Sequence, residues 1–361
     1  MSRRSFEWAP ASLHLAAHHP FALRRGWVQW TYVLAGVLAL LAVPSVLPPY
    51  WLHLANLSLI AVIGAVALNL LTGNARLVSL GQAALLGVGG FAAGLLVRAF
   101  PGIPFPIVLC GATVAGLLIG LIVALPSLRL RVLYVAVTTL ALHFAAVTVF
   151  AIIQAVVLDS SGINMPVAAI AGFELGSAVR WYFVLLSLAA LTVLGALNLL
   201  RSHIGRRWVA VGEHDVAAES LGVSVARAKL SVFVVSSAVV SSAGALSAYY
   251  IGTVSYESYN FGLAISYLAM IIIGGLGSVL GSVLGAVLIT LLPYALDQVF
   301  AVVGLQIRAS TLAGLQEMLF GALIVGFLLF EPRGLAEVWR RVRTAAADWP
   351  FRYRAAQRAT R

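Results

Sequence analysis

Long apolar runs joined by short connections are the feature of this sequence that most restricts its fold. There are about ten, at 27–48, 52–71, 83–99, 105–125, 132–157, 181–200, 230–250, 259–276, 279–299 and 315–331. A helix of about 20 apolar residues spans the hydrocarbon core of a bilayer. Lipid offers no partners to backbone polar groups, so a spanning segment is a helix or part of a closed barrel. We therefore expect an all-α, polytopic membrane protein with about ten transmembrane helices. The range of eight to ten stays open, because only GGLGS separates 259–276 from 279–299 and the two could form one bent hairpin.

Composition supports the membrane assignment. Hydrophobic residues make up 61% of the chain and charged residues 10%, whereas soluble domains have about 45–50% and about 25%. The net charge of +11 does not indicate nucleic acid, because the basic residues gather at the two ends and in a few loops. Cys110 lies inside an apolar run, which predicts a small buried side chain and no disulfide.

The positions of Lys and Arg predict the topology. With the N-terminus in the cytoplasm and ten alternating spans, 20 of the 23 basic residues face inward and only Arg98, Arg180 and Arg308 face outward. Cytoplasmic loops carry such an excess, so we expect both termini in the cytoplasm. The predicted parts are a cytoplasmic tail at 1–26, a transmembrane domain at 27–335 and a basic cytoplasmic tail at 336–361. The last of these is expected to rest on anionic lipid headgroups as a partly helical segment.

One connection, residues 201–229, is longer and more polar than the others. It carries five basic and three acidic residues and is placed in the cytoplasm by the charge count. Asp215 is expected to cap a short helix over 216–221, and Gly222 to end it in the left-handed conformation. Such a helix, tied to spans on both sides, can transmit a push from a partner. A solvated connector without a partner is the alternative.

The sequence lacks the motifs of several enzyme and pump classes. Lys229 is the only lysine and follows Ala228, so a phosphate-binding P-loop is excluded. We find no catalytic triad and no His–Glu pair with metal-ligand spacing within a span. The spacing of His14, His18 and His19 would suit a metal, but we interpret this segment as a basic tail and expect no catalytic residue, bound metal or cofactor. No carboxylate lies near the middle of a predicted span, which argues against proton coupling, although backbone carbonyls alone can bind sodium. The serines at 236–247 are expected to serve helix packing. A transport pathway without a nucleotide site or a proton-coupling carboxylate implies that a separate subunit supplies the energy.

Two glycine-rich segments, 68–96 and 268–293, are predicted to interrupt spans. Glycines at such spacing break helices or let them pack closely, and broken helices form transporter substrate sites. We therefore predict a substrate pathway in this region, and its candidate residues are Asn69, Gly73, Gly81, Gln82 and His143. Three further glycines are predicted to form a tight turn with a hinge or packing role: Gly274, Gly275 and Gly277.

At these segments the chain resembles the permease subunits of bacterial branched-chain amino acid ABC importers, of the LivM type. The resemblance covers about 52–340. The matching segments are LNLLTGNARLVSLGQAALLGVGGF (68–91), LRLRVLYVAVTTLAL (128–142), GEHDVAAESLGVSVARAKLSVF (212–233), IIIGGLGSVLGSVLGA (271–286) and FGALIVGFLLFEPRGL (320–335). Two stretches depart from the family pattern: DSSGINMP at 159–166 replaces a Gly-rich outer loop, and Asn74, Ala75 and Arg76 stand where a Gly-rich turn is usual.

The resemblance implies a multi-pass permease subunit in the bacterial inner membrane, without a nucleotide site of its own. It would pair with a second, LivH-like permease subunit and with two cytoplasmic ATPases that use ATP and Mg. An extracytoplasmic solute-binding protein would deliver the solute. The expected ATPase-docking residues are Arg206, Arg207, Glu213, Asp215, Ala217, Ala218, Glu219 and Gly222. The solute is expected to be a branched-chain amino acid, but the family also includes permeases for urea, short amides and other small solutes.

Two function classes remain as alternatives. One is a secondary carrier or channel that works alone; a neighbouring gene for a P-loop ATPase would argue against it. The other is a membrane-embedded enzyme or structural subunit. The enzyme reading requires a buried catalytic cluster in a polar cavity.

Overall fold

The computed structural model describes residues 38–127, 132–157, 162–170, 173–303 and 334–348, together with Gly36 and a few positions between 314 and 326. The chain divides into two compact units, Met1–Leu47 and Pro48–Arg361. In the first unit, residues 38–46 are helical, within the predicted span 27–48. The predicted span 315–331 lies almost entirely outside the described residues. The account below concerns the second unit.

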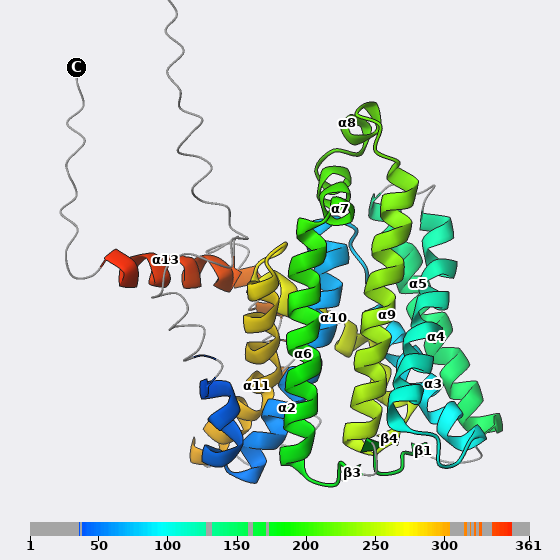
Figure 1. Cartoon of the computed structure of the whole chain (residues 1–361), viewed down its shortest axis with the longest axis vertical. Helices are drawn as coiled ribbons and strands as arrows, with labels where there is room; N and C mark the ends of the chain where they lie inside the picture. Colours follow the sequence, from blue (N-terminus) through cyan, green and yellow to red (C-terminus); the bar gives the residue numbers. More distant parts are fainter. Residues whose placement is uncertain are drawn as a thin grey trace, which may run out of the picture. The chain divides into compact units, whose positions relative to one another are not determined.

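Six helices of the described part are long and apolar enough to cross a membrane. They are α2 (Pro49–Asn69), α3 (Gln82–Ala99), α4 (Phe105–Ser127), α5 (Val132–Ile152), α6 (Ala178–Arg201) and α9 (Val225–Ile251). They confirm six of the predicted apolar runs and the all-α polytopic class. α9 packs against α2, α3 and α4, and α6 packs against α2. Figure 1 shows α4, α6 and α9 running along a common direction.

The predicted hairpin at 259–299 forms as two helices, α10 (Phe261–Gly274) and α11 (Val279–Val303). Gly275 and Gly277 in the turn have φ of 115° and 79°, values that side chains with a Cβ rarely adopt. α10 has 14 residues and is about 21 Å long, shorter than a hydrocarbon core of about 30 Å. α10 alone is therefore too short for a full span, which favours the alternative of one bent hairpin at 259–299, and the total of ten spans stays a prediction.

Shorter elements lie at the helix ends. Two π-helical turns, η2 (Leu70–Asn74) and η3 (Ile153–Val157), follow α2 and α5, and the 3₁₀ turn η4 (Tyr256–Tyr259) precedes α10. β1 (Ile163–Asn164) pairs antiparallel with β4 (Thr253–Val254), with Ile163 opposite Val254. β2 (Ala169–Ile170) pairs with β3 (Phe173–Glu174). A last helix, α13 (Gly334–Asp348), contacts α10 and α11.

Small residues let α3, α4 and α9 approach closely. A Cβ on Gly244 of α9 would lie 2.7 Å from the Leu86 carbonyl carbon of α3, and one on Gly120 of α4 would lie 2.5 Å from the Ser237 Cβ. Two serines of α9 donate hydrogen bonds across helices: Ser241 Oγ to the Leu85 carbonyl and Ser236 Oγ to the Ala67 carbonyl, each at 2.8 Å. Lipid is as apolar as leucine, so close packing and such hydrogen bonds drive helix association in a membrane. The packing role predicted for the serines is confirmed for Ser236 and Ser241.

This packing makes a matched pair of glycine substitutions informative. Gly244→Ala places a methyl group against the α3 backbone and should destabilise the protein by about 1–3 kcal/mol, the usual effect of overpacking. Gly195→Ala, inside α6 with nothing within 4 Å of the added Cβ, should be neutral or stabilise by up to about 1 kcal/mol. The melting temperatures of the two variants are compared by heating each protein in detergent and measuring the folded fraction by size-exclusion chromatography. Equal melting temperatures for the two variants would contradict the packing described here.

Candidate functional site

The polar connection 201–229 folds into two helices, and the first was not predicted. α7 (His203–Glu213) begins at Ser202, whose Oγ accepts a hydrogen bond from the Gly205 N–H at 3.3 Å. Trp208 is fully buried, and its Nε1 donates to Ser231 Oγ of α9 at 2.8 Å. A serine followed by one apolar face with Trp208 and Val211 is the signal in the sequence that could have predicted this helix.

α8 (Asp215–Ser220) confirms the predicted short helix, with one correction. Asp215 is its first residue and His214 is the cap position. The Asp215 carboxylate still accepts the Val216 N–H at 2.9 Å. Gly222 has φ of 81°, as predicted, and the Val223 N–H closes the turn on the Ala218 carbonyl at 3.0 Å. Figure 1 shows α8 standing beyond the ends of α6 and α9.

Most residues predicted to dock a partner are accessible on α7, α8 and their ends. The exposed ones are Arg206, Arg207, Glu213, Asp215, Ala217, Glu219 and Gly222. Ala218 is the exception: it is 3% exposed, because it faces back into the fold. Two apolar side chains that we did not nominate are open instead, Val216 at 70% and Leu221 at 84%. The accessible surface of α8 is therefore apolar as well as acidic.

An ion pair ties the end of α7 to the segment after α2. Glu213 Oε1 lies 2.9 Å from an Arg76 guanidinium nitrogen, and both side chains are more than half exposed. An exposed pair of this kind stabilises by only about 0–1 kcal/mol. Arg76 has φ of 53°, an uncommon backbone conformation for a residue other than glycine. The ion pair therefore adds little to the stability of the fold, and its main effect is to orient Arg76 in this uncommon backbone conformation.

Beneath the ion pair two backbone segments cross closely, residues 69–77 and 275–278, and we call this crossing the junction. Asn69 is fully buried, and its Oδ1 accepts the Gly277 N–H at 2.9 Å. Asn74 Nδ2 donates to the Asn69 carbonyl at 3.2 Å. A Cβ on Gly73 would collide with the Asn69 side chain and the Gly277 nitrogen. Asn69 and Gly73, predicted for a substrate pathway, thus hold the end of α2 to the turn between α10 and α11.

Helix α7 packs directly on the junction. A Cβ on Gly212 would lie 2.7 Å from the Asn74 carbonyl oxygen and 2.9 Å from the Ala75 carbonyl carbon. From α8, a contiguous series of contacts therefore runs through α7 and the 74–76 segment to Asn69 and the α10–α11 turn. The glycines of that turn are close-packed: a Cβ on Gly274 would lie 2.6 Å from the Gly281 carbonyl carbon. Their predicted hinge role stays a prediction.

The other predicted pathway residues also lie inside the bundle. Gln82 Nε2 donates to the Gly64 carbonyl at 3.0 Å and joins α3 to α2. A Cβ on Gly81 would lie 3.1 Å from the Thr139 carbonyl oxygen of α5. His143, one turn further along α5, is 1% exposed, and its Nδ1 has no hydrogen-bond partner among the described residues. Its ring lies beside Phe144 and Phe261.

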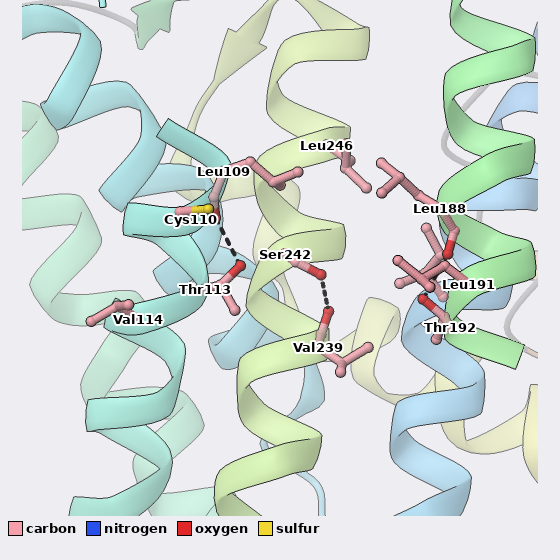
Figure 2. Close-up of a pocket in the computed structure, with 11 residues that line it drawn as sticks. Leu109, Cys110, Thr113, Val114, Leu188, Leu191, Thr192, Val239, Ser242 and Leu246 are labelled. Carbon is pink, nitrogen blue, oxygen red and sulfur yellow. Dashed lines mark hydrogen bonds between the residues drawn. The ribbon is translucent and has the colours of Figure 1, made fainter. Parts of the chain in front are cut away.

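A groove runs between α6 and the helices α4 and α9. It consists of two adjoining cavities of about 370 and 570 Å³ that share Leu191, Thr192 and Val239, and we call it the α6 groove. None of the predicted pathway residues lines it. Figure 2 shows α4, α6 and α9 side chains facing one another across the smaller of the two cavities.

The lining of the α6 groove is mostly apolar. The hydroxyls of Thr113, Thr192 and Ser242 donate to carbonyls of their own helices at 2.7, 2.8 and 2.7 Å, as the dashed lines in Figure 2 illustrate. Cys110 also lines the groove and is exposed, so the expectation that it is buried is wrong. Among the described residues, no group of three or more His, Cys, Asp or Glu side chains could hold a metal ion.

The Asn69 hydrogen bond can be tested at the amide it accepts. Asn69→Ala removes the acceptor of the Gly277 N–H, and the loss of about 0.5–1.5 kcal/mol should speed exchange of that amide roughly two- to tenfold. Hydrogen–deuterium exchange of a peptide covering 275–278 measures this. Ser266→Ala is the control, because its hydroxyl bonds only to the Gly262 carbonyl within α10. Unchanged exchange of the Gly277 amide in Asn69→Ala would contradict the hydrogen bond between the two residues.

Comparison with known proteins gives one consistent result. The family model described as "Branched-chain amino acid transport system / permease component" matches residues 50–328. The high-affinity branched-chain amino acid transport system permease protein LivM of Escherichia coli (strain K12) is 28% identical, covering 86% of this chain and 76% of the relative. LivM of Salmonella typhimurium (strain LT2) is 27% identical, with the same coverage. No solved structure matches the chain.

Proposed function

We propose, because this chain belongs to the family of permease components of branched-chain amino acid transport systems, that it is the membrane-spanning subunit of an ATP-driven importer. The observation that carries the proposal is the α7–α8 module. It stands outside the bundle, presents an accessible surface and is packed onto the junction through Gly212. The importer lies in the bacterial inner membrane, with both chain ends and the module in the cytoplasm. The excess of Lys and Arg on that side supports this topology.

The energy is supplied by partners. Since Lys229 is the only lysine, the chain has no P-loop, and we assign ATP and Mg to two cytoplasmic ATPase subunits. A second, LivH-like permease subunit completes the membrane part, and an extracytoplasmic solute-binding protein delivers the solute. The predicted tails, 1–26 and 336–361, flank the permease domain 27–335.

We assign ATPase docking to α8 and its flanks. Val216 and Leu221 insert into an apolar pocket of the ATPase, while Asp215 and Glu219 meet its basic groups. Glu213, Arg206 and Arg207 flank the contact, and Ala217 and Gly222 complete its surface. Ala218 supports it from the inside. Because Trp208 holds α7 to Ser231 of α9 at 2.8 Å, a push on α8 moves α7 as one body and shifts the junction.

The lining of the α6 groove supports a solute with an apolar side chain. The charged ends of an amino acid, like urea or a short amide, need hydrogen-bond partners when they leave water, so the groove can select a solute only through its side chain. The three groove hydroxyls direct their protons to helix carbonyls and leave an apolar lining. We therefore propose that the branched side chain of the solute passes along this groove. Buried residues inside the bundle then support the helices of this pathway: Asn69, Gly73, Gly81, Gln82 and His143. The hinge of the pathway consists of Gly274, Gly275 and Gly277.

Docking is tested by substitutions on α8. Leu221→Asp and Glu219→Arg should each reduce co-purification of the ATPase, and ATP-dependent leucine uptake into vesicles, by at least about tenfold, the effect of losing about 1.4 kcal/mol or more. Glu257→Arg is the matched control, since Glu257 is exposed in η4 rather than on the docking module. Full ATPase binding by both α8 variants would refute the assignment. Uptake that needs no ATP would instead indicate a stand-alone carrier.

The groove is tested through its own cysteine. Cys110 is the only cysteine of the chain and is exposed in the groove, so a bulky maleimide should react there and block leucine uptake. Cys110→Ala should transport normally and resist the reagent. Leucine, but not urea, should slow the labelling. Labelling without any loss of uptake would remove the groove from the pathway.

A further inference from the structure

Helix α13 has two chemically different faces. Leu335, Val338 and Trp339 follow one face at the spacing i, i+3, i+4, and Glu337, Arg340 and Arg341 follow another at the same spacing. This is the pattern of an amphipathic helix. The polar face is internally paired: Arg340 Nε donates to Glu337 Oε2 at 2.8 Å, and Arg341 Nε lies 3.6 Å from Glu337 Oε1. The hydrogen bond and the charge of Glu337 raise the pKa of Arg340.

Only the first turn of α13 is embedded in the protein. Gly334 is buried, and Leu335 packs against the core. Beyond that turn the apolar face is open, with Val338 41% and Trp339 50% exposed. A helix of 15 residues is marginal in water without packing on one face. Its uncovered apolar face therefore needs an apolar surface to rest on.

The setting of α13 indicates which surface this is. Figure 1 shows α13 running across the direction of α11 and not along it, outward from the helices it touches. An amphipathic helix with this direction lies in the plane of a membrane interface, with tryptophan at the headgroup level and arginine toward the headgroups. The sequence around it is strongly basic: from residue 333 to 361 it has eight arginines and two acidic residues.

We infer that α13 is an interfacial helix that binds anionic phospholipid headgroups through Arg340 and Arg341, with Val338 and Trp339 in the acyl boundary below. The occupant of its open face is thus the lipid surface of the cytoplasmic leaflet. The inference rests on the proposed function for the choice of leaflet and for the effect on coupling, but not for the binding of lipid by α13. Charge complementarity supports it, since each arginine near an anionic surface strengthens binding about fivefold.

The position of α13 gives lipid binding a consequence. Gly334 has φ of 66°, and a Cβ there would lie 2.6 Å from the Gly275 nitrogen and 2.7 Å from the Ile273 carbonyl oxygen. Gly275 belongs to the α10–α11 turn, whose neighbour Gly277 donates to Asn69. The lipid-bound helix therefore holds the same turn that α7 reaches from the docking module. Anionic lipid is expected to fix the turn and so to support coupling.

The test measures the depth of α13 in the full-length protein. In a Cys110→Ser background, Val338→Cys carries a nitroxide spin label, and the protein is reconstituted into vesicles of phosphatidylcholine or of an equal mixture with phosphatidylglycerol. Val216→Cys on α8 is the matched water-exposed site. With phosphatidylglycerol, the label at 338 should collide with oxygen and be shielded from a water-soluble nickel chelate. The label at 216 should show the opposite behaviour.

Charge removal then separates headgroup binding from apolar anchoring. Arg340→Gln with Arg341→Gln should move the label at 338 toward water in the phosphatidylglycerol vesicles, and Arg98→Gln in the last turn of α3 should not. A nickel-accessible label at 338 in both vesicle types would overturn the inference and point to a protein partner on that face. A label at 338 that lies equally deep with and without phosphatidylglycerol, and with and without the two arginines, would also overturn headgroup binding. These measurements need no transport, so they stand whether or not the proposed function does.

A second readout addresses coupling. In the assembled transporter, phosphatidylglycerol should raise ATP-dependent leucine uptake several-fold over phosphatidylcholine alone, and the double arginine variant should lose this stimulation while it keeps the rate in phosphatidylcholine. Stimulation that persists in the double variant would show that the lipid effect does not act through α13.

Discussion

The hydrogen bond between Asn69 and the Gly277 amide is the interaction on which the functional architecture depends. α2 ends there in a π-helical turn, and α10 ends after only 14 residues, so several backbone groups lose their helical partners within one small region. An unsatisfied backbone group in an apolar environment costs several kcal/mol. The buried Asn69 side chain accepts one such N–H, that of Gly277, at 2.9 Å. This bond lets the end of α2 pack against the turn that follows α10. The contacts of α7 and α13 then converge on the same crossing.

Around this crossing, the bundle is held by small residues more than by large ones. Gly244 and Gly120 bring backbones into contact, and the serines of α9 donate to carbonyls of neighbouring helices. Large apolar side chains gain little from turning inward, because lipid receives them equally well. This explains why Leu191 on α6, for example, can be 67% exposed. The close packing around α9 and the open α6 groove have the same cause: lipid solvates large apolar side chains as well as the protein interior does.

The sequence predicted the class, six of the long spans, the glycine breaks and the short helix ending at Gly222, because each follows from local properties: apolar length, glycine spacing and turn chemistry. It failed where the outcome depends on what a residue packs against. Trp208 anchors an unpredicted helix to Ser231, 23 positions away, and Ala218 faces inward although its neighbours face out. Cys110 was expected to be buried, yet it lines a groove, since an apolar run does not reveal which side of its helix meets another helix. The roles of the docking and pathway residues remain predictions.

The amino-acid sequence by itself determined that this chain is an all-α membrane protein of a permease family, because lipid accepts only segments whose backbone is satisfied within the helix and whose side chains are apolar. It also indicated residues 201–229 as the candidate segment for a partner contact, since no other connection between the predicted spans carries as many charged residues. Only the tertiary structure decided that α7, α13 and the α10–α11 turn converge on the junction around Asn69. That meeting joins residues more than 200 positions apart, and no local propensity encodes contacts at such separation.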